Sequence, residues 1–101
     1  MSNKVRLKVA DTGEEYMFDL PRILLGRGNT CNIVLPKNML MVARCHAEIL
    51  IHRNVKYIRD YASTNGTWLN GVRLESGKLY VLHTGDEIVL ARSYKLTVLE
   101  A

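Results

Sequence analysis

What this sequence lacks already excludes several classes of protein. Its longest apolar run, Met39 to Ala43, falls far short of the ~18 residues that a membrane-spanning helix needs. No apolar leader of the signal-peptide type opens the chain, and no block of five or six like charges forms a nucleic-acid-binding tail. We therefore expect an intracellular, cytoplasmic protein, although a domain excised from a longer chain would look the same.

Cysteine is also scarce. The two cysteines, Cys31 and Cys45, give no disulfide pattern. In a cell interior both would stay reduced, and we expect both to be buried, inert, small apolar residues.

The composition predicts one folded domain spanning residues 1–101. Apolar residues make up 48% of the 101 residues, enough for a single core and too many for a disordered chain. The formal net charge of +4 is modest. It favours acidic partners, namely phosphate, nucleic acid or anionic surfaces, without choosing among them.

Alternation of apolar and polar residues is the main pattern, and no window carries a helical stripe. Val5, Leu7 and Val9 alternate with basic residues, and the same period of two returns in 47–52, 88–90 and 96–98. Turn residues interrupt these segments at short intervals. The sequence therefore predicts an all-β fold, a two-sheet antiparallel β-sandwich of about eleven short strands.

Three loops differ from simple connections. They cover residues 26–30, 38–44 and 62–67, and they carry arginine, histidine, hydroxyl and amide side chains. The third begins a run, Ser63 to Gly71, in which two Asn-Gly steps stand five residues apart. Each step predicts a tight turn, and the three residues between them suit a very short strand.

In order and spacing these pieces resemble the forkhead-associated (FHA) family, and the match spans about two-thirds of the chain. The motifs that carry the resemblance are Leu25-Gly26-Arg27, Cys31-Asn32-Ile33-Val34-Leu35, Val42-Ala43-Arg44-Cys45-His46-Ala47, Asp60 with Ser63-Thr64-Asn65-Gly66-Thr67, Asn70-Gly71, and Leu82 with Gly85-Asp86-Glu87-Ile88. The resemblance implies a β-sandwich that binds phosphothreonine peptides, without catalysis or a cofactor.

The resemblance also assigns roles to binding residues. Arg27 is similar to the family's phosphate-binding arginine, whose guanidinium can hold two oxygens at once. Thr64 matches the position that lines the phosphothreonine site, and Asn65 the residue that bonds the peptide backbone. Arg44 resembles a secondary contact to phosphate or peptide. Asn70 either reaches the ligand or shapes its own turn.

Other residues are expected to support the site. The resemblance gives His46 a structural role, in which it bonds loop backbone rather than ligand. Gly26 and Gly66 are expected to allow the loop conformations, since a side chain at Gly26 would crowd the arginine. We predict that Asp60 braces a neighbouring loop and that Trp68-Leu69 belongs to the core.

The sequence departs from the family at Ala43, where the family pattern Ser-Arg-x-His reads Ala43-Arg44-Cys45-His46. That serine hydroxyl is a principal phosphate donor in the family. A hydrogen bond to a charged group contributes ~1.5–3 kcal/mol, so its loss weakens binding roughly ten- to a hundredfold. Two interpretations follow. Either Arg27, Arg44 and Thr64 still hold phosphate, helped by the Ala43 backbone N–H or a water, or the domain has become a phosphate-independent interaction module.

The apolar part of the second loop suggests a partner surface. If residues 39–42 alternate, Leu40 and Val42 point inward and Met39 and Met41 point outward. Exposed methionines suit an adaptable apolar contact with a peptide or a second protomer. The alternative is that the loop folds over and buries them.

Rival functions find less support. Cys45 and His46 are neighbours, which on a strand point to opposite faces, so they do not form a nucleophile and base. No paired metal-ligand spacing occurs, and Gly26-Arg27-Gly28 lacks the ending of a nucleotide loop. The basic side chains near the start of the chain could bind nucleic acid, but such a face is more often a sheet edge or a solvated surface.

Overall fold

Eleven strands and no helix make up residues 3–101, the part of the chain that this computed structural model describes. The strands are β1 (Lys4–Val9), β2 (Glu15–Asp19), β3 (Arg22–Gly26), β4 (Ile33–Val34), β5 (Ala47–His52), β6 (Val55–Asp60), β7 (Thr67–Leu69), β8 (Val72–Arg73), β9 (Tyr80–Val81), β10 (Glu87–Leu90) and β11 (Tyr94–Glu100). The all-β prediction is confirmed. The structure does not describe residues 1–2. The expectation that no leader segment opens the chain concerned these residues in part, and that part lies outside the described residues.

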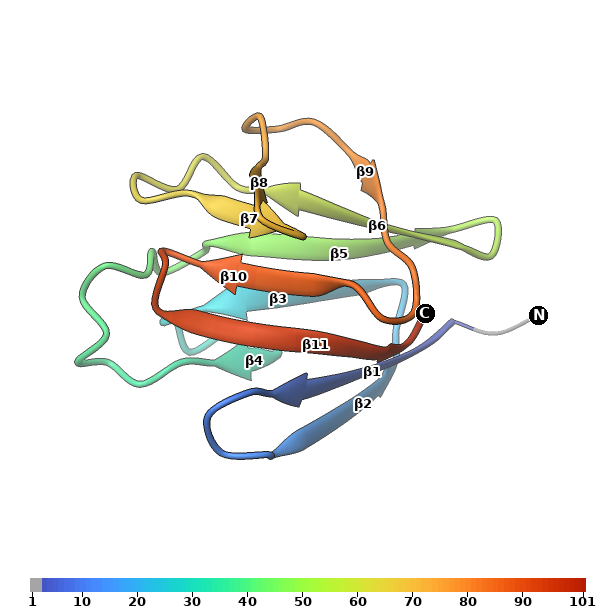
Figure 1. The fold of residues 1–101 in the computed structure, drawn as a ribbon, viewed down its shortest axis with the longest axis horizontal. Helices are drawn as coiled ribbons and strands as arrows, with labels where there is room; N and C mark the ends of the chain where they lie inside the picture. The colour runs from blue at the N-terminus through green and yellow to red at the C-terminus, as the bar shows by residue number, and fades with distance from the viewer. Residues whose placement is uncertain (1–2) are drawn as a thin grey trace.

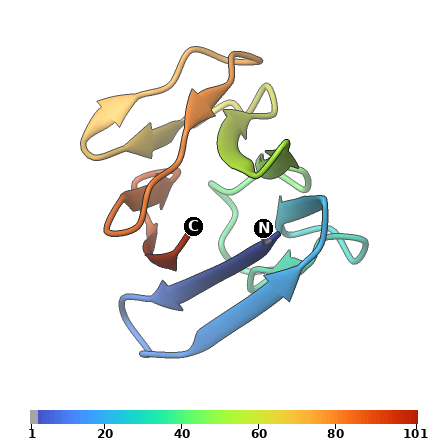
Figure 2. The same ribbon diagram turned by 90° about the vertical axis from the view of Figure 1, so that its right-hand side faces the viewer.

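The strands form two sheets that face each other (Figures 1 and 2). One sheet has six strands in the order β2-β1-β11-β10-β7-β8, and the other has five in the order β4-β3-β5-β6-β9. All strand pairs are antiparallel except β3 with β4. Consequently the two sheets bury one face each and leave the other to solvent.

Period-two alternation places the core between the sheets. In β1 the apolar residues Val5 and Leu7 are fully buried, while their neighbours are more exposed. Other strands supply most of the remaining fully buried apolar side chains, among them Ile23, Leu25, Ile49, Ile58, Ile88, Leu90 and Leu96. Burial at about 25 cal/mol per Å² of apolar surface makes this layer the main source of stability.

The outer face of the five-stranded sheet holds a buried carboxylate. The Glu48 side chain has no exposed surface, and it accepts hydrogen bonds from Arg22 Nε at 2.6 Å and Arg59 Nε at 2.7 Å. Glu48 lies opposite Arg59 across the β5–β6 pair. Burial raises the pKa of Glu48, but the bonds from the two guanidinium groups outweigh it, so the pKa lies below its ordinary value.

Four loops gather at one end of the sandwich. They connect β3 to β4, β4 to β5, β6 to β7 and β10 to β11, on the left of Figure 1, where the β1–β2 turn also lies, while Ala101 lies at the opposite end. Because a loop's conformation here is not constrained by the sheet ladder, its side chains are available for contacts. All three loops singled out in the sequence lie at this end.

Both cysteines are free, as expected, but only Cys31 is buried. Cys45 is half-exposed, so the prediction that both are buried was wrong for Cys45. Within residues 3–101, no helix is long and apolar enough to cross a membrane.

Candidate ligand-binding loops

The first loop follows β3 and is bonded to the second through its backbone. Arg27 N donates to Ala43 O at 3.1 Å, and Gly28 N donates to Arg44 O at 2.9 Å. A Cβ on Gly26 would lie 2.2 Å from the Arg44 carbonyl oxygen, closer than any real contact. Glycine is therefore required at Gly26 by the approach of the second loop's backbone.

Arg27 is anchored at one nitrogen. Its Nε donates to the Val42 carbonyl oxygen, and the side chain is half-buried. Among residues 3–101 no bond is recorded for its two terminal nitrogens, Nη1 and Nη2. The Nε bond therefore orients the guanidinium and leaves its outer edge available for an anion.

Ala43 uses both of its backbone groups within the loops. Its N–H donates to His46 Nδ1 at 3.0 Å, and its carbonyl accepts from Arg27 N. The backbone N–H that the sequence analysis offered in place of the missing serine hydroxyl is therefore already bonded. The neighbouring Arg44 side chain is exposed, while its carbonyl accepts from Gly28 N and from the Cys31 thiol at 3.1 Å.

His46 is fully buried between the second and third loops. Its Nε2 lies 2.7 Å from the Gly66 carbonyl oxygen, and its Nδ1 accepts from Ala43 N–H. These partners require a neutral ring with the proton on Nε2. Burial lowers the pKa of His46, an effect that the bond to Gly66 only partly opposes, so the neutral form is favoured. Both ring nitrogens are engaged with backbone.

The third loop is organised around the buried Asp60 carboxylate. It accepts from the Ser63 hydroxyl at 2.5 Å, from Ser63 N at 3.2 Å and from the Thr67 hydroxyl at 2.7 Å. Ser63 Oγ in turn accepts from Gly66 N at 3.1 Å. The prediction that Asp60 braces a loop is confirmed.

Thr64 and Asn65 lie at the tip of this braced loop. Thr64 is exposed, and its hydroxyl has no recorded partner among residues 3–101. Asn65 Nδ2 donates to the Met41 carbonyl oxygen at 2.8 Å, which joins the third loop to the second. The amide oxygen of Asn65 remains available to accept a bond, such as one from a peptide N–H.

Asn70 is held away from the other candidate residues. It lies in the β7–β8 turn with φ of 51°. Its Nδ2 donates to Asp86 Oδ1 at 3.0 Å and its Oδ1 accepts from Glu87 N at 2.9 Å. Glu87 begins β10, whereas the loop end lies at the other end of that strand. The structure therefore brings together Arg27, Ala43, Arg44, Thr64 and Asn65, and it ties Asn70 to the start of β10.

The apolar segment of the second loop differs from its prediction. Leu40 is 76% exposed, although it was expected to point inward, whereas Met39 is half-buried and packs against the core. The segment is a turn rather than a strand, because Met39 N donates to Pro36 O and Val42 N donates to Met39 O. Period-two alternation therefore does not apply. Val42 is fully buried and Met41 is 56% exposed, as expected.

Trp68 is also not where the sequence predicted. Instead of joining the core, it is half-exposed, and the guanidinium groups of Arg73 and Arg92 lie 5.3 and 5.1 Å from its ring centroid. Neither arginine was predicted from the sequence as a site residue. Arg73 could have been found, because the two-residue turn at 70–71 pairs Trp68 with Arg73. Nothing local to Arg92 predicts its position.

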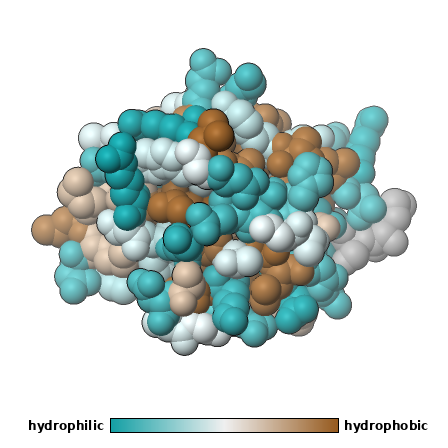
Figure 3. Space-filling model, in the orientation of Figure 1, coloured by the Kyte–Doolittle hydropathy of each residue, from teal (hydrophilic) through white to brown (hydrophobic). Residues whose placement is uncertain are grey.

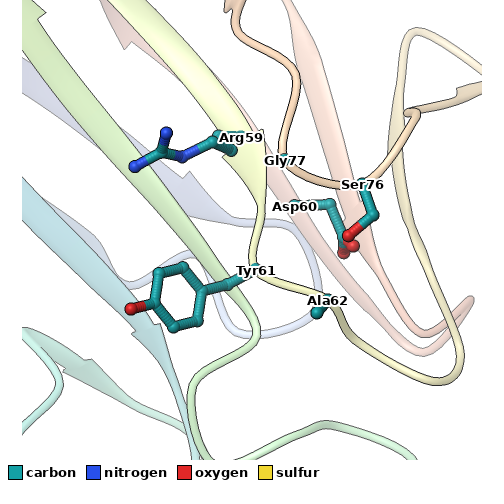
Figure 4. A pocket seen from close by; sticks show the side chains of 6 residues that line it. All are labelled: Arg59, Asp60, Tyr61, Ala62, Ser76 and Gly77. Carbon is teal, nitrogen blue, oxygen red and sulfur yellow. The ribbon is translucent and has the colours of Figure 1, made fainter.

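A cavity of about 370 Å³ between the third loop and the segment after β8 contains no free charged group. In Figure 4 the Arg59 and Tyr61 side chains point to one side of it, and Asp60 and Ser76 to the other. Arg59 is bonded to Glu48, and Asp60 is bonded to two hydroxyls. This cavity therefore has no charged group left to bind a ligand.

The residues once considered for catalysis or metal binding can be checked against the structure. His46 cannot act as a base, since both of its nitrogens are engaged. Within residues 3–101, no group of three or more His, Cys, Asp or Glu side chains could hold a metal ion.

For the basic strand near the start of the chain, the sequence left two alternatives, a sheet edge or a solvated surface, and the structure excludes the sheet edge. β1 lies between β2 and β11, and Arg6 on it forms ion pairs with Glu15 at 3.1 Å and Glu100 at 4.0 Å. The acidic neighbours reduce the field that this face could present to nucleic acid.

Comparison with known proteins gives a family match. The family model described as "FHA domain" matches residues 23–91. The probable serine/threonine-protein kinase fhkA of Dictyostelium discoideum is 38% identical over 80 residues, which cover 72% of this chain and 13% of the kinase. Protein FraH of Nostoc sp. is 37% identical over 62 residues, covering 61% of this chain and 22% of that protein. The chain thus spans a small part of these relatives.

Solved structures match over almost the whole chain. The N-terminal FHA domain of Saccharomyces cerevisiae Rad53p, in complex with a phosphothreonine peptide, is 25% identical with a TM-score of 0.83, covering 97% of this chain and 94% of that one. The FhaA FHA domain, complexed with the intracellular domain of Rv3910, is 30% identical with a TM-score of 0.80, covering 93% and 98%.

Proposed function

Because this chain belongs to the forkhead-associated family, we propose that it is a non-catalytic interaction domain whose loop end binds a phosphothreonine peptide. The relatives support this proposal, since one solved structure holds a phosphothreonine peptide and another concerns phosphothreonine-dependent interactions. In this chain Arg27, Arg44 and Thr64 are the residues that would contact the phosphate. Asn65 would bond the backbone of the peptide.

One observation carries the proposal. The three loops satisfy their own backbone groups through bonds to one another, and they leave the outer edge of Arg27, the Arg44 side chain and the Thr64 hydroxyl without a recorded partner among residues 3–101. Positive and hydroxyl donors at one end of a braced scaffold match a dianion with three acceptor oxygens. No carboxylate competes for them in the recorded contacts.

Ala43 limits the expected affinity. The hydroxyl of the family serine is absent, and the Ala43 N–H is bonded to His46. Phosphate binding would then depend on Arg27, Arg44 and Thr64. We expect the affinity to be roughly ten- to a hundredfold lower than with a serine at this position.

We also propose that residues 1–101 form one domain of a longer intracellular protein. The chain spans 13% and 22% of the kinase and of protein FraH, respectively. In such a protein the domain would recruit a phosphorylated partner to whatever activity the remaining residues carry.

The test is a titration of the domain with a degenerate phosphothreonine peptide pool and with its unphosphorylated counterpart. We expect selective binding of the phosphorylated pool, loss of that binding in Arg27→Ala, and tighter binding in Ala43→Ser. Arg53→Ala is the matched control, because Arg53 is exposed in the β5–β6 turn, on a different loop. Equal binding of both pools by the native domain, unchanged by Arg27→Ala, would contradict the proposal.

A second candidate function is a phosphate-independent apolar contact. Leu40 and Met41 are 76% and 56% exposed, and apolar surface gathers at the left edge of Figure 3, where the β4–β5 loop lies. Met39 contributes only partly, because it packs against the core. If this surface is the function, Leu40→Asp with Met41→Asp abolishes partner binding or self-association while Arg27→Ala has no effect. The reverse pattern favours phosphate recognition.

A further inference from the structure

A second group of side chains at the loop end surrounds Trp68. Arg73 lies opposite Trp68 in the β7–β8 hairpin, and Arg92 comes from the β10–β11 turn. Their guanidinium groups are 5.3 and 5.1 Å from the same ring centroid. Both contacts are in the range of cation–π attraction, which fixes the two cations over the ring.

These residues line a cavity of about 250 Å³ together with Met41, Thr64 and Asn65. We call it the Trp68 pocket. Thr64 and Asn65 belong to both the Trp68 pocket and the proposed phosphopeptide loops, so the two sites adjoin. A peptide that crosses the third loop would pass from one to the other.

Within the described part of the chain, the two arginines of the Trp68 pocket have no carboxylate partner. Among residues 3–101 no ion pair is recorded for Arg73 or Arg92, and both side chains are exposed. Their distances from one ring place the two charges no more than about 10 Å apart, which is comparable to the Debye length of about 8 to 10 Å at 0.15 to 0.1 M salt. Like charges so close repel each other, and an anion between them relieves that repulsion.

The backbone fixes Arg92 in position. Ala91 and Arg92 have φ angles of 53° and 57°, the left-handed region that Asn and Gly adopt more readily than Ala or Arg. Ala91 N donates to Gly66 O at 2.9 Å, and Ser93 N donates to Leu90 O at 3.0 Å. A turn tied to the third loop in this way holds Arg92 beside Trp68 in advance of any ligand.

We propose that the Trp68 pocket binds an acidic side chain of the partner, namely a carboxylate or a second phosphorylated residue a few positions from the phosphothreonine. This inference rests on the proposed function, because the same peptide occupies both sites. The oxyanion accepts from Arg92 and Arg73, and its aliphatic part packs against Trp68 and Met41. The Trp68 pocket therefore selects among phosphothreonine peptides by their flanking charge.

The experiment uses matched phosphothreonine peptides that differ at one position. Glutamate, phosphoserine or glutamine is placed in turn at each of the positions flanking the phosphothreonine, and affinities are measured by calorimetry. Emission of Trp68 provides a second readout, since it is the one tryptophan in the chain. The phosphoserine and glutamate series distinguish the two sources of the oxyanion.

Arg92→Asn is the decisive variant, because asparagine tolerates the left-handed backbone. Arg53→Asn is its control, since Arg53 has a φ of 50° in a turn that does not line the Trp68 pocket. Arg73 is less suitable, because its side chain packs against the third loop, with Nε 2.8 Å from where a Cβ on Gly66 would be, so a substitution there also removes a contact of that loop.

At one position we expect the acidic peptide to bind about two- to fivefold more tightly than the glutamine peptide and to change Trp68 emission. Arg92→Asn should remove this preference and leave the glutamine peptide unaffected, whereas Arg53→Asn should change neither. Two results would overturn the inference. One is equal affinity for the acidic and glutamine peptides at every position, and the other is an equal loss of affinity for both peptides in Arg92→Asn.

Failure of the proposed function has a different signature. In that case no phosphothreonine peptide binds in an Arg27-dependent manner. An unphosphorylated acidic peptide at high concentration then tests the Trp68 pocket alone. A change in Trp68 emission that Arg92→Asn abolishes supports the pocket, and no change rejects it.

Discussion

Two groups of arginines behave differently in this molecule. Arg22 and Arg59, on the outer face of the five-stranded sheet, both bond the buried carboxylate of Glu48. Arg27 and Arg44, at the loop end, make no recorded ion pair among residues 3–101. Arginine side chains thus pair with a carboxylate on the sheet face, whereas the arginines of the loop end have no recorded carboxylate partner among residues 3–101. The arginines of the sheet face and those proposed to bind an anion are therefore separate groups, and substitutions can test this separation.

The largest effect is expected where the loops contact each other. Gly26→Ala would place a Cβ 2.2 Å from the Arg44 carbonyl oxygen and 3.0 Å from that of Ala43. Relieving this overlap moves the second loop and should cost about 3 kcal/mol of unfolding free energy. Urea denaturation measures it, and phosphopeptide affinity should fall at the same time.

Gly77→Ala is the matched control for this change. A Cβ there meets nothing within 4 Å, although φ is +81°. Only backbone strain of about 1 kcal/mol should then appear. Equal costs for the two variants would mean that loop contact does not determine the result.

The next effect is expected on the sheet face. Glu48→Gln removes the charge that Arg22 and Arg59 share, and it should lower the free energy of unfolding by about 2 kcal/mol. Phosphopeptide affinity should not change. Glu75→Gln, at an exposed glutamate, is the control. A loss of peptide binding in Glu48→Gln would break the separation between the two regions.

Arg44→Ala should produce the opposite pattern. Its side chain is exposed and bonds no other described residue, so stability should stay within about 0.5 kcal/mol of the native value. Affinity for a phosphothreonine peptide should fall severalfold, and the dependence on salt should become weaker. Calorimetry at two salt concentrations, beside thermal unfolding, separates the two effects. A stability loss as large as that of Glu48→Gln would contradict the comparison.

The smallest effect concerns pH. Because the pKa of His46 is lowered from 6.5 in the folded protein, the unfolded chain binds a proton first as the pH falls. Stability contributed by neutral His46 is present above pH 6.5 and is lost progressively as the pH falls toward the lowered pKa of the folded state. The pKa of Glu48 is lowered from 4.5. The stability that ionised Glu48 contributes is therefore lost only as the pH falls below about 4.5.

Denaturation at a series of pH values should therefore show two separate declines. His46→Gln should remove the upper one, and Glu48→Gln should remove the lower one. A single decline below pH 5 in the native protein would show that His46 does not couple folding to protons.

Local patterns predicted the strands well and the exposed surfaces less well. Period-two alternation was sufficient for β1 because one face of that strand meets the core. The same rule failed at Leu40, because residues 36–42 form turns, in which successive side chains do not alternate. Trp68 was misplaced for a different reason. An aromatic residue is apolar in sequence, but Thr67 is the buried residue of β7, and the Trp68 ring lies beside Arg73 and Arg92 instead of in the core.

The site itself required long-range information. The motifs located Arg27, Arg44 and Thr64 on loops, but not the bonds that join those loops through His46 and Asn65. The Glu48 cluster was equally hidden, since it depends on the register of β3, β5 and β6. Register is a property of the assembled sheet, and no local pattern specifies it.

The pairing of β1 with β11 has a mechanical consequence. The two strands run antiparallel in the middle of one sheet, with Arg6 opposite Glu100, so the first and last strands enter and leave side by side. A pulling force applied through the two ends would load their hydrogen bonds one after another, as in a zipper, instead of all together. Under tension these two strands would separate first, at the end of the sandwich away from the ligand-binding loops.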